Sequence, residues 1–371
     1  QADAFGEVGA GLQLGPNAVR VLQAWGLGDA LRAVAAFPDE LRVRDAQHGR
    51  QLGQLRLGAH AQSRYGQPYA TLHRADLHQL LLTAVQGRAD VALRQGARVT
   101  AFEPQAGAVT ASLSTGETVH TAALLGCDGL WSAVRAQLLG DGPPQPTGHL
   151  AWRGMVRTAD LPARLRANAV TAWLGPRHHL VHYPVRRGEW VNLVAVVHGQ
   201  AAAGSDARSW LQAADGADLR RTLGPLCTDL QAVVDAVPQW SLWQLHDRPP
   251  LQAAAQMAQG RLALLGDAAH PMRPYLAQGA AMALEDAWTL GRLAASVPRT
   301  ALDWPATLAR YAQARQPRVA RVQQRSQRNG RVFHADGWLR RGRNAAMALL
   351  GERLLDNRWL YAGPPDPSGT T

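Results

Sequence analysis

The chain has 371 residues, 46% of them hydrophobic, so it is long enough to bury the core of one large α/β domain or of two smaller ones. Its net charge is +11. The chain contains no lysine, and its arginines are spread along the sequence among acidic residues. We therefore expect no nucleic-acid partner, and we interpret the densest basic stretch, residues 315–343, as a solvated helical face.

Cysteine usage and hydropathy narrow the class of protein further. Cys127 and Cys227 are too few for a disulfide framework, and we find neither a signal peptide nor an apolar run of the ~20 residues that span a bilayer. We therefore expect a cytoplasmic protein with no membrane association. The 13 histidines follow no spacing typical of zinc ligands, so we also expect no metal.

The first part of the chain alternates between helical and strand patterns. Apolar positions at helical spacing, with a proline in the first turn, predict a helix over 15–34. Alternation predicts strands over 40–56, and an amphipathic helix follows over 73–87. Residues 91–127 read as a run of strands, of which the last, 121–127, is apolar throughout, as a buried parallel strand should be.

The second part contains a separate sheet and a helical end. Residues 150–200 alternate as an antiparallel sheet, and residues 206–236 are predicted to be helical. The strand "RLALLGD" follows, then a helix from Gly279, and residues 301–361 are helical again. Buried strand–turn–helix units beside a separate antiparallel sheet predict an α/β protein of two interleaved domains.

The stretch "LALLGDAAHPMRPYLAQGAAMALEDA" carries the strongest chemical signal. Asp267 follows a buried strand, at the edge of the sheet where ligands of open α/β folds bind, and its carboxylate can accept hydrogen bonds from a sugar or ribityl hydroxyl. Pro271 stiffens the turn and offers an apolar face to a flat ring. Gly279 leaves the start of the next helix bare, which favours negative charge such as that of a reduced flavin. The alternative is an ordinary strand–loop–helix unit with a capping aspartate.

A second stretch, "LLGCDGLWSAVR", repeats the pattern of a buried strand that ends in Asp-Gly. Asp128 and Gly129 follow the strand, and a helix begins at about Ser132. The motif is weak alone, but a second carboxylate at a strand end is able to face the same cleft as Asp267.

Both stretches resemble the two downstream fingerprints of the single-component FAD-dependent aromatic hydroxylases, which have the para-hydroxybenzoate hydroxylase fold. The segments "GEVGAGLQLGPNAVRVL", "HRADLHQLL", "HHLVHYPV", "LHDRPPL" and "LLDNRWLYAG" are similar to the branch of salicylate hydroxylase and 6-hydroxynicotinate 3-monooxygenase. The resemblance covers the chain to about Gly363. It implies a glutathione-reductase-type FAD-binding domain interleaved with an antiparallel-sheet substrate domain, followed by C-terminal helices.

The resemblance also implies domain boundaries. The FAD-binding domain would be discontinuous, and the substrate domain would be inserted within it. The expected segments are 1–42, 70–151 and 248–300 for the FAD-binding domain, 43–69 and 152–247 for the substrate domain, and 301–371 for the C-terminal helices.

Cofactor contacts carry over residue by residue from the same resemblance. Arg74 in "HRADL" would reach the phosphate or ribityl region of FAD, unless it simply pairs with Asp76, and Val99 would give a backbone contact to adenine, unless it is a plain strand residue. The remaining implied contacts are Asp128 near the pyrophosphate, Asp267 on the ribityl chain, Pro271 beside the flavin, and the amides of Gly279 and Ala280 at the pyrimidine edge of the flavin.

Three residues are the implied substrate contacts. His179 and Tyr183 lie four apart in "HHLVHYPV", so on a strand they face the same side, and they resemble the histidine and tyrosine of 6-hydroxynicotinate 3-monooxygenase. His179 is the candidate base for a phenolic proton, with Tyr183 relaying or orienting, although each alone also fits plain sheet packing. Gln13 stands where the hydroxynicotinate enzyme has a histidine, and it cannot act as a base. We expect His270 to be structural.

One part of the family pattern is not in this sequence. Family members begin with a strand, a G-x-G-x-x-G turn and a helix that hold the ADP half of FAD, whereas "GEVGAG" at Gly6–Gly11 has the wrong spacing and no preceding strand. We expect that the chain begins about 30 residues after the usual family start.

The implied activity is the hydroxylation of a small aromatic acid or phenol by O2. NADH or NADPH would reduce bound FAD, and a flavin C4a-hydroperoxide would transfer the oxygen atom. The alternatives are an FAD-dependent reductase or epoxidase of the same fold and a degenerate, non-catalytic binding protein. We leave a homodimer open.

Overall fold

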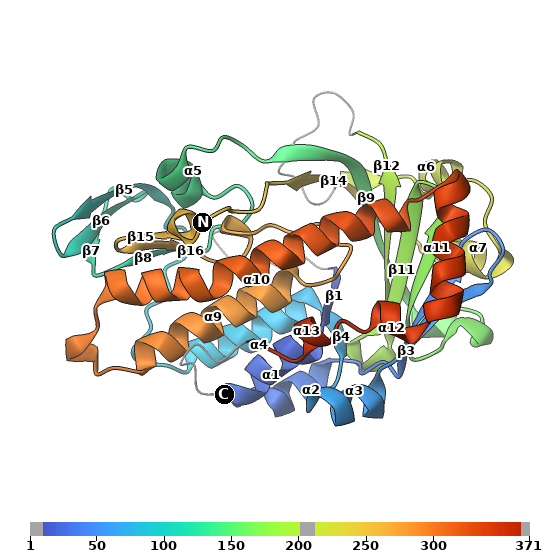
Figure 1. Cartoon of the computed structure of the whole chain (residues 1–371), viewed down its shortest axis with the longest axis horizontal. Helices are drawn as coiled ribbons and strands as arrows, with labels where there is room; N and C mark the ends of the chain where they lie inside the picture. The colour runs from blue at the N-terminus through green and yellow to red at the C-terminus, as the bar shows by residue number, and fades with distance from the viewer. Residues whose placement is uncertain (1–9, 201–211, 365–371) are drawn as a thin grey trace.

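The structure is a computed structural model that describes residues 10–200 and 212–364. A large sheet forms one end of the molecule and two small sheets form the other, with long helices between them (Figure 1). The observed architecture is the mixed α/β fold that the sequence predicts.

The large sheet has eight strands and is antiparallel except where β10 and β2 run parallel. It contains the strands predicted over 40–56 and 150–200. In spatial order, its strands are β13 (Gln212–Ala214), β14 (Trp240–Asp247), β9 (Gln145–Arg157), β12 (Trp190–His198), β11 (His178–Val185), β10 (Ala169–Gly175), β2 (Glu40–Asp45) and β3 (Gln51–Arg56).

One of the small sheets contains both strands that precede Asp128 and Asp267. In one small sheet β8 and β16 run parallel and β15 completes the order β15–β16–β8, whereas β5, β6 and β7 form an antiparallel meander. A separate pair, β1 and β4, is antiparallel. The bounds are β1 (Gly11–Leu14), β4 (Ala70–His73), β5 (Val99–Gln105), β6 (Ala108–Leu113), β7 (Thr118–Thr121), β8 (Leu124–Gly126), β15 (Ala258–Gln259) and β16 (Leu262–Leu264).

Two strand predictions in this region are wrong. Residues 91–98 form no strand, and the side chains of Val91 and Leu93 are exposed. The buried strand predicted over 121–127 shortens to the three residues of β8, and Leu125 within it is 37% exposed.

The helices largely follow the predicted segments. The helix expected over 15–34 is split in two at Gly26, whose φ of 77° ends the first helix. Residues 206–211 lie outside the described residues, and the rest of that predicted helical segment begins with the short strand β13. The helices are α1 (Pro16–Ala24), α2 (Gly28–Val34), α3 (Gly58–Tyr65), α4 (Arg74–Gln86), α5 (Ala133–Leu139), α6 (Gly216–Leu223), α7 (Thr228–Asp235), α8 (Ala254–Met257), α9 (Gly279–Ala295), α10 (Trp304–Phe333), α11 (Gly337–Leu350), α12 (Glu352–Leu355) and α13 (Arg358–Tyr361).

The prediction of a solvated arginine face over 315–343 holds only in part. Arg321, Arg328, Arg331 and Arg341 are exposed, whereas Arg315 is 1% exposed and Arg343 is 7% exposed. Arg315 pairs with two buried carboxylates of α9, so the interface of α9 and α10 is held by buried charge as well as by apolar packing. Helix α10, of 30 residues, extends from the small sheets to the large one (Figure 1).

Candidate active site

The loop after β16 turns sharply and is held by one buried carboxylate. Gly266 has a φ of 56°, and a side chain there would lie 3.3 Å from the Cβ of Ala283, so the turn requires glycine. Asp286 of α9 accepts a hydrogen bond from the amide of Gly266 at 2.9 Å, and its Oδ2 lies 2.5 Å from Nε2 of His270. His270 therefore contacts the carboxylate that fixes this loop.

Buried arginines hold Asp286 and its neighbour Glu285 in place. Nε of Arg315 lies 2.7 Å from Asp286, and its Nη1 lies 2.7 Å from Glu285, which also pairs with Arg318 at 2.7 Å. Desolvation alone would raise the pKa of both carboxyls, but these cations and hydrogen bonds outweigh it, and the pKa of each lies below its usual value. The network ties the loop that carries Asp267 to α9 and α10.

Asp267 lies beside the start of α9. Its side chain is exposed, yet the surrounding protein desolvates it enough to raise its pKa, against the opposing influence of His270 and Arg74. A side chain at Gly279 would come within 3.9 Å of Oδ1 of Asp267 and no closer to anything else. Helix α9 begins there with no side-chain cap, and Ala280 is its second residue. The corner combines a carboxylate with uncapped amides.

These features fit the flavin end of FAD. The carboxylate can accept hydrogen bonds from ribityl hydroxyls, and the amides at the start of a 17-residue helix favour negative charge on a flavin ring. Pro271 is buried and its carbonyl accepts a hydrogen bond from Gln323 at 2.9 Å, so it stiffens the loop from within.

Asp128 follows the neighbouring strand but has local partners. Strands β8 and β16 are parallel and in register at Gly126 and Leu264, so Asp128 and Asp267 leave the same edge of the sheet. The carboxylate of Asp128 accepts bonds from the Ser132 hydroxyl at 2.5 Å and from the Ala133 amide at 2.7 Å, and it thereby caps the first turn of α5.

A buried arginine connects α5 to the loop after β16. Nη1 of Arg135 donates to the carbonyls of Ala268 and Ala269 at 3.1 and 2.8 Å. Helix α5, which follows β8, is therefore hydrogen-bonded to the loop that follows β16, although the carboxylates of Asp128 and Asp267 have different surroundings.

The other two predicted cofactor residues lie apart from each other. Arg74 is the exposed first residue of α4, close enough to lower the pKa of Asp267, whereas Asp76 pairs with Arg186 at 3.2 Å. Val99 is the first residue of β5, and its backbone pairs with Leu113 in the meander, which is a different sheet from the one that precedes Asp267.

A cavity of about 620 Å³ lies between the large sheet and the C-terminal helices. Gln13 and His179 line it, together with Tyr69 and Tyr275. The loop 274–277 and the C-terminal helices supply much of the remaining wall, and apolar side chains of β2, β10 and β11 complete it on the side of the sheet. Tyr69 donates to Oε1 of Gln13 at 2.8 Å, and Gln13 hydrogen-bonds the hydroxyl of Tyr183. The structure thus brings the three predicted substrate residues to one region.

A glycine permits this arrangement. The amide of Gly11 donates to Oδ1 of Asn192 at 2.7 Å, and a side chain on Gly11 would lie 2.6 Å from Asn192 and 2.8 Å from Tyr183. Strand β1 can therefore approach β11 and β12 closely only with glycine at this position, which places Gln13 beside Tyr183.

His179 is uncharged at neutral pH. Burial, with smaller contributions from His178 and His149, lowers the pKa of His179 to about 3. Its Nδ1 lies 2.8 Å from Nε2 of His334, the residue that ends α10. Burial also raises the pKa of Tyr183, so its hydroxyl keeps its proton.

Two arginines of the cavity have side-chain nitrogens without a hydrogen-bond partner among the described residues. They are Nε of Arg325 and Nη2 of Arg343, both buried. Desolvation, the largest cause, lowers the pKa of Arg343 to about 10, so it is still a cation at neutral pH. Such donors suit an anionic group on a bound molecule.

The sequence did not indicate Tyr69, Tyr275, His334, Arg325 or Arg343. They come from separate elements, and only the packing of α10 and α11 against the sheet brings most of them together. Along the described residues, none of the helices has the length and apolar character to cross a bilayer.

Comparisons with known proteins agree with this geometry. A family model described as "FAD binding domain" matches residues 8–326. The chain is 37% identical over 364 residues to 3-hydroxybenzoate 6-hydroxylase of Polaromonas naphthalenivorans (strain CJ2), which covers 97% of this chain and 88% of that protein. It is 34% identical over 350 residues to 6-hydroxynicotinate 3-monooxygenase of Bordetella bronchiseptica, covering 93% of this chain and 85% of that one.

Solved structures share the fold. A substrate complex of salicylate hydroxylase superposes with a TM-score of 0.80 at 26% identity, over 95% of this chain and 87% of that one. HpxO of Klebsiella pneumoniae, complexed with FAD and uric acid, has the same TM-score at 25% identity and the same coverage of both chains.

Proposed function

The chain belongs to the FAD-binding family of flavin-dependent aromatic monooxygenases, and on that premise we propose that it hydroxylates a small aromatic acid in the cavity lined by Gln13 and His179. The observation that carries the proposal is the cavity itself. It combines an uncharged histidine with two arginines, Arg325 and Arg343.

FAD is the cofactor of this family and carries out the redox steps of the reaction. When bound, it supplies the redox chemistry by which electrons from NADH or NADPH and one atom of O2 give a hydroxylated ring, the second oxygen atom leaving as water. The protein has to bind and orient both partners and keep water away from the reacting ring.

We propose cofactor roles for the residues around Asp267. Asp267 would bond the ribityl chain, and the amides of Gly279 and Ala280 would face the pyrimidine edge, supported by the uncapped start of α9. Arg74 would reach a phosphate or ribityl oxygen from α4.

The remaining cofactor proposals concern Asp128, Pro271 and Val99. Asp128 would act near the pyrophosphate by shaping the start of α5, since both of its oxygens serve that cap. Pro271 would stiffen the loop beside the flavin, and Val99 would offer a backbone contact to adenine.

His179 and Tyr183 would act on the substrate hydroxyl. An imidazole with a pKa of about 3 is neutral throughout the neutral pH range, so one of its ring nitrogens offers a lone pair. We propose that His179 accepts the phenolic hydrogen bond through Nε2, since its Nδ1 faces His334, and so raises the electron density of the ring. Gln13 and Tyr183, hydrogen-bonded to each other, would orient the substrate.

Arg343 and Arg325 favour an acid over a neutral phenol. Arg343 and Arg325 both line the cavity, and a carboxylate on the substrate would balance their positive charge. Relatives named for 3-hydroxybenzoate are among the most similar, and glutamine at position 13 differs from the hydroxynicotinate pattern, so a hydroxybenzoate is the first substrate to test.

The test is a panel of hydroxybenzoates and hydroxynicotinates with the FAD-loaded protein. We expect NAD(P)H oxidation, O2 uptake and a product heavier by one oxygen atom with at least one hydroxybenzoate. FAD reduction without O2 uptake or hydroxylated product would favour a reductase. A protein that does not bind added FAD would contradict the proposal.

We also propose a division into domains. The proposed FAD-binding domain comprises 1–42, 70–151 and 248–300, the substrate domain 43–69 and 152–247, and the helical end 301–371. The segregation of the small sheets from the large one supports it.

Finally, we propose a cytoplasmic homodimer. The use of NAD(P)H and the two free cysteines support the compartment. On α11, Trp338 and Leu349 are 83% and 85% exposed and lie eleven residues apart, which is three turns, so they share one face with the exposed Gly342 and Ala345. This apolar stripe would pack against the same stripe of a second copy.

A further inference from the structure

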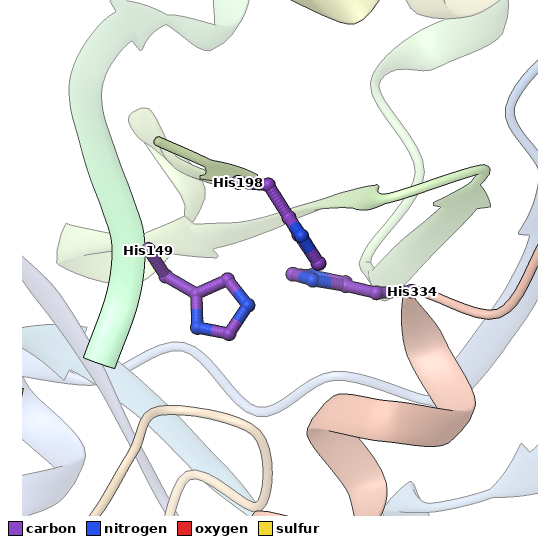
Figure 2. A group of neighbouring side chains, drawn as sticks. All are labelled: His149, His198 and His334. Carbon is purple, nitrogen blue, oxygen red and sulfur yellow. The ribbon is translucent and has the colours of Figure 1, made fainter. Parts of the chain in front are cut away.

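Three histidines converge beside the cavity, although they are far apart in the sequence. His149 on β9 and His198 at the end of β12 are direct antiparallel partners, and His334 ends α10 (Figure 2). The ring centroid of His149 lies 4.6 Å from that of His198, and the ring of His334 lies 5.0 Å from each. One nitrogen from each ring can be chosen so that all three lie within 4.8 Å of one another.

The backbone holds these three positions together. The ladder between β9 and β12 sets the spacing of His149 and His198. The amide of Arg177, in the turn before β11, donates to the carbonyl of His334 at 3.1 Å, and its carbonyl accepts from the amide of His198 at 3.3 Å. Two paired strands and the end of a helix, joined by these backbone hydrogen bonds, therefore fix the relative positions of the three histidines.

Several buried polar atoms of this cluster have no hydrogen-bond partner in the part of the chain that the structure describes. They are Nδ1 of His149, Nδ1 of His334 and the hydroxyl of Tyr275, whose ring lies 6.0 Å from that of His149 and 5.6 Å from that of His334. His334 and Tyr275 are only 6% and 3% exposed, whereas His198 is exposed and gives access from solvent. Unsatisfied buried donors and acceptors in one place indicate a ligand that they share.

The donor set suits a transition-metal ion. Imidazole nitrogens are typical ligands of Zn²⁺ and related divalent ions, and three protein ligands with a fourth, open position make a recurrent zinc geometry. Of the nearby charges, Arg273 is neutralised by Asp247 at 2.7 Å, and Asp336 opposes the effect of Arg177 on His198.

We propose that His149, His198 and His334 together bind one divalent transition-metal ion of the zinc class, with the Tyr275 hydroxyl beside it. Zn–N bonds of 2.0–2.1 Å require ligand nitrogens about 3.4 Å apart, so the rings must rotate inward, which the exposed side chain of His198 can do most freely. The sequence prediction of no metal is thereby revised, because the ligands come from segments whose spacing matches no zinc pattern.

The ion would also act on the cavity, a consequence that rests on the proposed function. Since Nε2 of His334 lies 2.8 Å from Nδ1 of His179, an ion on Nδ1 of His334 leaves Nε2 as an N–H donor. His179 then accepts at Nδ1 and carries its hydrogen on Nε2, facing the substrate as a donor. Metal loading should therefore slow hydroxylation of a phenol.

The experiment measures metal binding apart from activity. Tag-free full-length protein with its FAD is stripped with EDTA, titrated with Co²⁺ and followed by the visible absorption of tetrahedral Co²⁺, and Zn²⁺ retained after gel filtration is measured by mass spectrometry. We expect one ion per chain. His198→Ala should weaken binding by ~100-fold or more, since even loss of an outer-shell partner costs 10–100-fold. His120→Ala, an exposed histidine on β7, should change nothing.

Two outcomes would overturn the proposal. One is Zn²⁺ retention below one ion per two chains, and the other is equal affinity in the His198→Ala variant and the wild type. Because His198 is exposed, its removal should leave the fold intact, which the melting temperature checks. Metal binding without any effect on hydroxylation would leave the site standing and would contradict only the proposed role of His179.

Discussion

Nδ1 of His179 lies 2.8 Å from Nε2 of His334, so one hydrogen bond joins the wall of the cavity to the end of α10. Both imidazoles are uncharged at neutral pH, because burial lowers the pKa of each. One ring must therefore donate and the other accept, and the tautomer of His334 sets which nitrogen of His179 offers a lone pair to the cavity.

Replacing His179 with alanine should lower kcat by about 10²- to 10⁴-fold, the usual loss when a group that assists proton transfer is removed. FAD affinity should stay close to that of the wild type, since the residues around Asp267 are unchanged. Rapid-mixing product formation and flavin fluorescence measure the two effects.

The control for this variant is His182→Ala. His182 is a buried histidine of the same strand, and it shares with His178 the face opposite to that of His179. Its replacement should therefore leave kcat unchanged, and the melting temperature of both variants shows whether either has lost stability. Equal rates in the His179→Ala variant and the wild type would reduce His179 to a packing residue.

Asp267→Asn should have opposite effects on the FAD-free and FAD-loaded protein. Desolvation raises the pKa of this carboxyl, so its charge costs stability at neutral pH, and the neutral amide should raise the melting temperature of the FAD-free chain. FAD should bind about 10- to 100-fold more weakly, because a hydrogen bond to a charged group contributes about 1.5–3 kcal/mol. Fluorescence titration and thermal unfolding measure both. Unchanged FAD affinity would remove Asp267 from the cofactor site.

Asp286→Ala should destabilise the fold by about 3–5 kcal/mol, because it leaves Arg315 and His270 buried without this carboxylate. Denaturant unfolding measures the loss. Asp303→Ala, which removes only an exposed cap of α10, is the control and should cost about 1 kcal/mol. A loss at Asp286 no larger than at Asp303 would contradict the importance of the network.

The pH dependence of stability gives a second measurement of the same network. The pKa values of Glu285 and Asp286 are depressed in the folded chain, so their contribution is complete above the unfolded carboxyl pKa of about 4 and is lost as the pH falls through the folded values. The free energy of unfolding, measured from pH 7 downward, should therefore fall at acid pH. Asp286→Asn should flatten that fall, and an equally steep fall in the variant would assign it to other groups.

Arg343→Met should raise KM for a carboxylated substrate by about 10- to 100-fold, since it removes a charged hydrogen-bond donor. For a phenol without the carboxyl group, KM should change little. Steady-state kinetics with the matched acid and phenol give the comparison. The same loss for both substrates would mean that Arg343 only shapes the cavity.

Leu349→Glu should convert a dimer to a monomer, because it places a charge in the exposed apolar stripe of α11. Light scattering measures the mass of each. Val297→Glu puts the same charge at a 37% exposed apolar residue beyond the end of α9 and should leave the dimer intact. A wild-type monomer would exclude the proposed interface.

Local patterns predicted most of the elements. Strict alternation marked the strands of the large sheet, and the bare Gly279 marked the start of α9. The break at Gly26 was missed because apolar spacing continues across it, although its positive φ ends α1. Residues 91–98 have strand composition, but a strand also needs a neighbour to pair with, which their sequence does not report.

The site was only partly predictable for the same reason. Asp267 follows a local motif, and His179 and Tyr183 share a face by simple alternation. His334 and Arg343 could not be found this way, because the path of α10 and α11 over the sheet decides their position. Arg315 was misread as solvated, since its partners on α9 lie about 30 residues earlier in the chain.

Helix α10 has a mechanical consequence. Arg315, which holds the loop of Asp267 through Asp286, and His334, which contacts His179, lie 19 residues apart, or about 28 Å along α10. Pro317 lies within this stretch and cannot donate a backbone hydrogen bond, so α10 bends more easily there than elsewhere. A movement of the Asp267 corner relative to the cavity at His179 would therefore bend the helix at Pro317 and leave the buried ion pairs of Arg315 intact.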